Sequence, residues 1–196
     1  MKRFFAVCLL VTLSACAAHA GLDPDPDSMG IYFDIAGFSN CIYRPAFSPI
    51  NVYLLLANPT AATSGFACTV TVSGVPYILL STVLAGGGLD LDPDANGYAV
   101  SSSHAYPNVQ GHIVLVTWSM MLQAQAVLEF LLGPPGSGGP VAPPPTCGRP
   151  LVWGEGGERC CGVSSGDVYL PVASVNNLCP VADEPVSFGA IKALYR

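Results

Sequence analysis

The chain has 196 residues, of which 51% are hydrophobic and only 10% are charged, and its formal net charge is −6. An acidic surface repels phosphate groups, so this composition excludes nucleic acid as a partner. The 21 glycines and 18 prolines stand between many short apolar runs, which is typical of strands joined by turns.

The first twenty residues have the pattern of a secretory signal peptide. Lys2 and Arg3 form a basic start, residues 4–13 are an apolar run, and Ala18-His19-Ala20 offers the small side chains that signal peptidase requires. We expect cleavage after Ala20 and a mature protein that is secreted, either periplasmic or extracellular. Such a compartment is oxidising and favours disulfides.

A lipoprotein is the alternative interpretation of the same segment. Leu13-Ser14-Ala15-Cys16 fits the four residues that end in a lipid-modified cysteine. Acyl chains on Cys16 would anchor the protein to a membrane instead of releasing it. The abrupt polar Asp/Pro segment that begins at Gly21 favours cleavage after Ala20.

Period-two apolar runs follow the signal peptide, separated by turn residues. They predict strands over 31–35, 50–56, 66–72, 77–83, 98–102, 112–118 and 126–132. None of the later apolar runs reaches the roughly 18 residues of a membrane helix, so we expect no transmembrane segment and a sandwich core instead. Residues 119–132 are rich in helix formers, and a helix is the alternative there.

Beyond residue 132 the composition changes. Residues 133–146 read GPPGSGGPVAPPPT, which predicts a linker or a surface loop because proline and glycine do not belong in a central strand. Residues 147–196 form a cysteine-rich segment that ends in a predicted strand over 186–195. We expect that strand to return to the sandwich of residues 21–132, since the segment has little apolar content for a core of its own.

Six cysteines remain after cleavage, which predicts three disulfides. The Pro/Gly-rich stretch divides them into two and four, so Cys41–Cys68 is the favoured first bridge. Cys160 and Cys161 are adjacent and point to different sides, so each is expected to join either Cys147 or Cys179, and the pairing among these four stays open. A zinc site is disfavoured because no C-x-x-C pair is present.

One acidic segment resembles the first half of a calcium loop. Asp90, Asp92, Asp94 and Asn96 alternate along the chain, and carboxylate oxygens are the ligands that Ca²⁺ prefers. The bidentate acid expected further on is missing, because Ser101 stands there. A solvated acidic turn is therefore favoured over a metal site, and no cofactor is expected.

The sequence context of the candidate catalytic motifs argues against catalysis. Residues 162–166 match G-x-S-x-G, but the nucleophile elbow requires a strand–turn–helix and a histidine that follows it. The last histidine is His112, far upstream, and His104 and His112 are expected to be exposed loop residues. The sequence therefore predicts a protein that is not an enzyme.

Aromatic residues support a second hypothesis, a carbohydrate- or calcium-binding module. Tyr98, Tyr106, Trp118 and Trp153 could stack on sugar rings if they were exposed. Trp118 shares a face with Val114 and Val116 and is expected in the core, which makes Trp153 the better candidate.

Several segments resemble a group of uncharacterised secreted bacterial proteins. DPDPDSMGIYFD at 23–34, the cysteines in Asn40-Cys41 and in Gly65-Phe66-Ala67-Cys68, and the closing residues 188–196, FGAIKALYR, carry the resemblance. It covers most of 21–132 and the C-terminal end, but not the insert at 147–179, and Phe188 stands where tryptophan is usual. The resemblance implies a bacterial origin and an immunoglobulin-like fold, and it carries no activity.

Together, these observations predict an all-β, immunoglobulin-like antiparallel β-sandwich with a Pro/Gly-rich loop and a small cysteine-rich C-terminal extension. The predicted function is that of a non-enzymatic structural or interaction module at or outside the cell envelope. Its partner is expected to be a protein or a glycan, contacted through sheet faces or loops such as residues 86–97.

Overall fold

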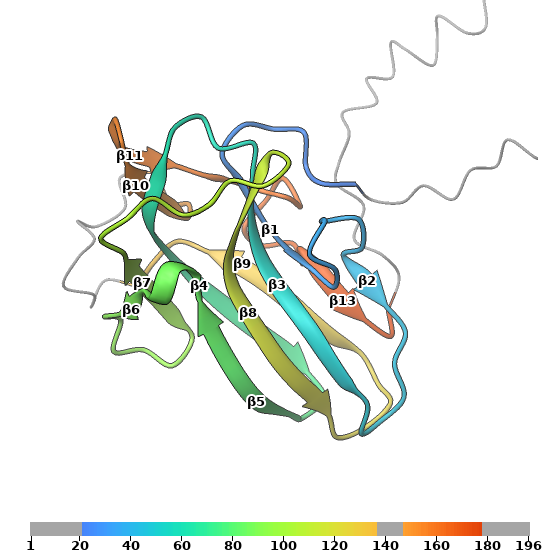
Figure 1. The fold of residues 1–196 in the computed structure, drawn as a ribbon. Coiled ribbons are helices and arrows are strands. Elements are labelled where there is room, and N and C mark those ends of the chain that lie inside the picture. Colours follow the sequence, from blue (N-terminus) through green and yellow to red (C-terminus); the bar gives the residue numbers. More distant parts are fainter. Residues whose placement is uncertain (1–20, 137–146, 178–196) are drawn as a thin grey trace, which may run out of the picture.

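The computed structural model describes residues 21–136 and 147–177 and shows two β-sheets packed face to face (Figure 1). This is the all-β sandwich that the alternating apolar runs predict. The expected signal peptide with Cys16, most of the Pro/Gly-rich stretch, Cys179 and the expected strand over 186–195 lie outside the described residues.

The strands follow one another with only a single 3₁₀ turn, η1 (Ala85–Gly87), among the described elements. In chain order the strands are β1 (Ser28–Tyr32), β2 (Cys41–Ile42), β3 (Pro49–Ala57), β4 (Thr63–Gly74), β5 (Tyr77–Leu84), β6 (Leu89–Asp90), β7 (Gly97–Ser101), β8 (His112–Leu122), β9 (Leu128–Gly133), β10 (Leu151–Gly154), β11 (Gly157–Cys160), β12 (Gly162–Val163) and β13 (Ala173–Val175).

The first sheet has five strands in the order β12-β1-β3-β8-β5. Its centre is the antiparallel pair β3–β8, in which Pro49 lies opposite Met121 and Ala57 lies opposite His112. A register shift after Leu54 keeps apolar side chains on the inner face at both ends of the pair. The short β12 pairs with β1 in parallel, and β5 forms the opposite edge.

The second sheet is organised by β4, the longest strand. Residues 63–67 of β4 pair with β10, residues 65–69 pair with β7, and residues 69–74 pair with β9. β9 then continues through β13 to β2, where the pairing is parallel. All the other pairings in this sheet are antiparallel.

The core consists of the side chains that both sheets direct inward. Fully buried members include Ile31, Val52, Leu54, Phe66, Val100, Leu115, Leu128 and Phe130. At its centre the rings of Tyr98 and Trp118 meet edge to face at 5.8 Å, and Trp118 Nε1 donates a hydrogen bond of 2.8 Å to the Tyr98 hydroxyl. This bond satisfies the polar atoms that burial would otherwise leave without water.

The cysteine-rich segment contributes strands to both sheets. It supplies β10 and β11 to one edge of the second sheet, β12 to the first sheet, and β13 to the interior of the second sheet. Leu151, Val152, Val172 and Ala173 are buried in the core. The segment therefore belongs to the sandwich, although its apolar residues are too few to show this in the sequence.

Two predicted elements differ from the structure in their bounds. β1 begins at Ser28 and ends at Tyr32, so Ile35 is 59% exposed in a turn instead of lying in a strand. That turn forms because the Asp34 carboxylate accepts the backbone N–H groups of Ala36 and Phe38. Residues 119–132 are strand, as predicted, but a turn over 123–127 divides them between β8 and β9.

In the part of the chain that the structure describes, no helix is both long and apolar enough to span a bilayer.

Gly65 allows β10 to pack closely, which gives a test of this arrangement. A methyl group on Gly65 would overlap the indole ring of Trp153, whereas one on Gly133 would meet no atom within 4 Å. We expect Gly65→Ala to lower the free energy of unfolding by about 1–3 kcal/mol. Gly133→Ala is the control and should change it by less than about 0.5 kcal/mol. Urea denaturation measures both, and equal effects would contradict the packing.

Candidate functional site

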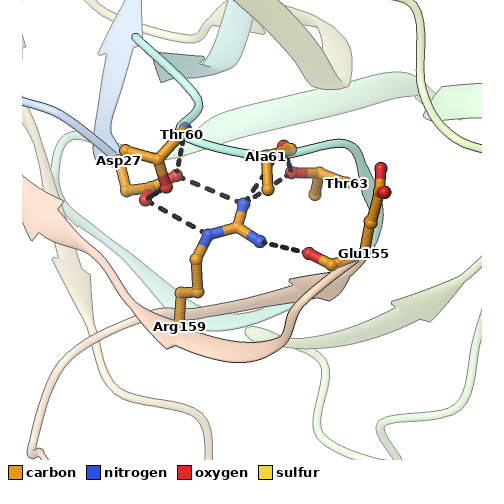
Figure 2. Close-up of polar contacts among 6 residues, drawn as sticks. All are labelled: Asp27, Thr60, Ala61, Thr63, Glu155 and Arg159. Atoms are coloured by element: carbon orange, nitrogen blue, oxygen red, sulfur yellow. Dashed lines mark hydrogen bonds and ion pairs between the residues drawn. The ribbon is translucent and has the colours of Figure 1, made fainter.

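The most connected polar cluster surrounds Asp27, directly before β1 (Figure 2). Its side chain is 10% exposed, and its backbone φ is +48°, a conformation that asparagine and aspartate tolerate better than most residues. The carboxylate accepts hydrogen bonds from the backbone N–H of Thr60 at 3.1 Å and from the Thr60 hydroxyl. Asp27 thereby joins the start of β1 to the connection between β3 and β4.

Arg159 of β11 completes the cluster from the cysteine-rich segment. Its Nε lies 3.2 Å from one carboxylate oxygen of Asp27, and its Nη2 lies 3.3 Å from the other. Nη2 also donates to the Thr63 hydroxyl at 3.0 Å and to the Ala61 carbonyl at 3.3 Å, while Nη1 reaches the Glu155 carbonyl at 3.5 Å. Figure 2 shows these contacts of the guanidinium group.

The electrostatics of Asp27 follow from these neighbours. Burial by itself would raise the pKa of the carboxyl group, but the hydrogen bonds from Thr60 and Arg159 and the charge of Arg159 outweigh burial. The pKa of Asp27 is therefore lowered and the group is ionised at neutral pH. Because both charges are matched within the cluster, the arrangement is suited to holding segments together and not to acid–base chemistry.

The predicted calcium ligands do not converge. Asp90 Oδ1 accepts the backbone N–H groups of Asp92 and Ala99, and Asp92 Oδ1 accepts that of Asp94. These bonds shape the turn before β7, as aspartates commonly do. Over residues 21–136 and 147–177, no three His, Cys, Asp or Glu side chains form a group that could hold a metal ion. Asn96 contributes its backbone carbonyl to the N–H of Val70.

The disulfide prediction is corrected at two cysteines. Cys41 is disulfide-bonded, but its partner is not Cys68, because Cys68 and Cys161 are free thiols buried in the core. Cys147 pairs with Cys160, one of the pairings that the sequence left open. Cys68 points inward as predicted, yet it packs as an apolar side chain.

Burial also sets the reactivity of the free thiols. It raises the pKa of Cys161 to about 12 and that of Cys68 still further. A thiol with such a pKa is almost entirely protonated at neutral pH and is a poor nucleophile or metal ligand. Neither cysteine is therefore a candidate catalytic residue.

The remaining motifs are separated in space. Ser164 of the G-x-S-x-G match is 8% exposed and lies against Gly30 of β1. Its backbone N–H donates a hydrogen bond to the Met29 carbonyl. His104 is exposed and contacts Ser103, as expected. His112 is 6% exposed, which corrects the expectation of an exposed loop residue, because it begins β8 and lines an apolar pocket of about 200 Å³ with Val109 and Val114.

The aromatic residues considered for carbohydrate binding are mostly in the core. Tyr98, Tyr106 and Trp118 are each at most 9% exposed, so they form no platform for a sugar. Trp153 is half-buried over Gly65. Among the residues that the structure describes, the exposed aromatic side chains are instead Phe38, Tyr43, Phe47 and Tyr169, which the period-two pattern could not single out because they lie in connections.

Sequence reasoning also missed the cluster of Asp27 and Arg159. The two residues are 132 positions apart, and no spacing rule relates them. In the sequence, Asp27 is one member of the Asp/Pro segment, and Arg159 stands beside two cysteines. The one available signal was the scarcity of basic residues, which makes each arginine a strong candidate partner for a buried acid.

Three solved structures are similar to this chain at low identity. No protein-family model matches the chain, and no curated protein matches it. A type II cohesin domain from the cellulosome of Acetivibrio cellulolyticus is 13% identical with a TM-score of 0.49, covering 80% of this chain and 98% of that one. A non-cellulosomal cohesin from the archaeon Archaeoglobus fulgidus is 11% identical with a TM-score of 0.43, and the alignment covers 69% of this chain and 84% of that one.

A third similar structure is the type II cohesin dyad from the adaptor ScaA scaffoldin of Acetivibrio cellulolyticus, 14% identical with a TM-score of 0.48. The alignment covers 77% of this chain and about half, 48%, of the dyad. At these identities and scores, the similarities carry no conclusion about partner or activity, and function has to be argued from the residues themselves.

The Asp27 cluster predicts a pH-dependent stability. Because the folded pKa is below the unfolded value, the stabilisation is complete above about pH 4 and is lost as the pH falls through the folded pKa. We expect Asp27→Asn to lower the free energy of unfolding by about 2 kcal/mol at neutral pH. The difference from wild type should shrink below about pH 4 in denaturation curves. A difference that persists unchanged to about pH 2 would contradict the lowered pKa.

The thiols give a second prediction. In protein purified without reductant and unfolded in guanidinium, mass spectrometry after alkylation should find Cys68 and Cys161 modified and Cys147 joined to Cys160. In the folded protein at about pH 8, both thiols should react orders of magnitude more slowly than free cysteine. A bridge that includes Cys68 would contradict this assignment.

Proposed function

We propose that the protein is an exported, non-enzymatic module that binds another protein through strand β5. β5 is the observation that carries the proposal. It reads YILLSTVL and contains no charged residue, and four of its apolar side chains are solvent-exposed: Ile78 38%, Leu79 49%, Leu80 52% and Val83 61%. An edge strand of this kind is a template for a strand from another chain.

The position of β5 makes this surface available. β5 pairs with β8 on one side, and among the described strands it has no neighbour on the other. Proteins usually protect such edges with lysine, proline or a covering loop. Among the described residues, β5 contains neither lysine nor proline and has a bulge between Leu79 and Ser81. A small hollow of about 50 Å³ opens beside it between the two sheets.

Two further observations support export and the absence of catalysis. The Cys147–Cys160 disulfide suits an oxidising compartment, in agreement with the signal-peptide pattern of residues 1–20. Ser164 is buried against β1, and the serine–histidine contact that the structure does show, Ser103 Oγ to His104 Nδ1 at 2.9 Å, joins two adjacent, exposed residues of a connection. Anchoring through Cys16 is the alternative to release from the cell.

Carbohydrate or calcium binding stays a prediction. Tyr98, Tyr106 and Trp118 are buried, and the carboxylates of Asp90 and Asp92 already accept backbone N–H groups.

A photo-crosslinking amino acid at position 83 tests the proposal in cells of the source organism. We expect crosslinks to one partner of discrete mass, and their loss when Leu80→Lys is added, because a charge on an edge strand blocks pairing. The matched control is the same amino acid at exposed position 149, which should give no such product. Equal products from both positions, or none from position 83, would contradict binding through β5.

Catalysis is tested separately with panels of ester, glycan and peptide substrates. We expect no turnover above buffer. Turnover that disappears in Ser164→Ala would contradict the non-enzymatic assignment, whether or not the crosslinks form.

A further inference from the structure

A second exposed surface lies at one end of the sandwich, the lower end in Figure 1. Three connections meet there: residues 43–48 between β2 and β3, residues 75–76 between β4 and β5, and residues 123–127 between β8 and β9. Backbone hydrogen bonds connect them. The N–H of Phe47 donates to the carbonyl of Leu122 at 2.8 Å, the N–H of Gln123 donates to the carbonyl of Pro76 at 3.0 Å, and the N–H of Val75 donates to the carbonyl of Val127 at 3.1 Å. These bonds make the three connections one continuous surface.

The connection between β2 and β3, which we name the Tyr43 loop (residues 43–48), is held in place by Asn176. The Asn176 side chain accepts the backbone N–H of Arg44 at 2.8 Å and donates to the Arg44 carbonyl at 2.9 Å. It also donates to Ala126 at 3.2 Å. A loop fixed on both sides loses little conformational entropy when it binds a partner.

The Tyr43 loop presents its large side chains to solvent. Tyr43 is 69% exposed and Phe47 is 67% exposed. Arg44 between them is also exposed, and the guanidinium contact found for it is Nη1 to the Tyr43 carbonyl at 3.3 Å. Tyrosine, tryptophan and arginine dominate binding energies at protein interfaces, and phenylalanine is enriched there.

Phe47 is also held in an unfavourable backbone conformation. Its φ is +61°, which is uncommon for any residue except glycine and an outlier for a bulky one. Such a conformation costs free energy and tends to be retained where the side chain has a function. Since the ring of Phe47 is 67% exposed, packing against the described residues does not account for this conformation.

The charge of this end differs from that of the rest of the chain. Residues 43–48, 75–76 and 123–127 contain no aspartate or glutamate, in a chain with a net charge of −6. Glu129, the acid nearest to them in sequence, accepts a hydrogen bond of 2.8 Å from Asn177. Surfaces such as the Asp90 turn would therefore repel an acidic partner, whereas this end would not. The difference in charge would favour acidic partners over basic ones at this end, and it would also orient the partner toward it.

We propose that the Tyr43 loop binds an acidic segment of a partner protein, with a carboxylate on Arg44 and an apolar side chain between Tyr43 and Phe47. The guanidinium group suits a carboxylate because it can donate two parallel hydrogen bonds. This surface is distinct from the exposed edge of β5, so the inference does not depend on binding through β5.

Fluorescence polarisation with a defined pair of probes tests the proposal on the full mature chain. One probe is a labelled ten-residue peptide of alternating Asp and Phe or Leu, and the other has Lys in place of every Asp. We expect the acidic peptide to bind at least about tenfold more tightly. Arg44→Glu should reverse this order, a result that misfolding cannot produce. Arg149→Glu changes the only other exposed arginine among the described residues and should leave the order unchanged.

Phe47→Gly separates binding from folding. Glycine adopts positive φ without strain, so this variant should melt at the same temperature as wild type or higher. Its affinity for the acidic peptide should nevertheless fall about tenfold, because the ring is lost. Wild-type affinity in Phe47→Gly would overturn the proposal.

Three further results would also overturn it. They are equal affinity for the two peptides, no binding of either at millimolar concentration, and a tenfold gain in affinity when residues 183–196 are deleted. The last result would show that the chain's own C-terminal segment, which contains Asp183 and Glu184, occupies the surface. Crosslinking from position 83 is unaffected by any of them, so failure here is distinguishable from failure of binding through β5.

Discussion

The antiparallel pairing of β3 with β8 is the constraint on which the rest of the fold depends. These two strands form the centre of the five-stranded sheet, and β1 and β5 attach to their outer sides. Their inner faces carry Val52, Leu54, Trp118 and Met120, all of which are nearly or fully buried. The second sheet has to cover this apolar surface, and the bond from Trp118 to Tyr98 fixes where it does so by satisfying two polar atoms inside the core.

Polar tertiary contacts take the role that disulfides were expected to have. Arg159 brings the cysteine-rich segment to Asp27, at the start of the first sheet, and to the connection between β3 and β4. Cys68 and Cys161 remain buried thiols, so apolar packing replaces one expected crosslink within the core. The Cys147–Cys160 bridge stabilises the segment locally, while Arg159 joins it to the sandwich.

What the surface exposes agrees with binding better than with catalysis. The reactive groups of the sequence motifs are buried or already hydrogen-bonded: Ser164 lies against β1, the two thiols lie in the core, and the Asp90 carboxylate caps its own turn. The side chains that are exposed instead are apolar and aromatic ones, along β5 and on the Tyr43 loop. Side chains that stay uncovered contribute little to folding, and this exposure is what supports the proposed contacts with other molecules.

The sequence by itself determined the two-sheet architecture and most of its strands, because a half-buried strand must alternate apolar and polar residues and the turn residues between the runs are local signals. It also determined that Trp118 belongs in the core, from the face that it shares with Val116. Only the tertiary structure decided the ending of β1 at Tyr32, the incorporation of β10 to β13 into both sheets, the free state of Cys68 and the pairing of Asp27 with Arg159. These features depend on which distant segments come within a few ångströms of one another, and neither period nor composition encodes that distance.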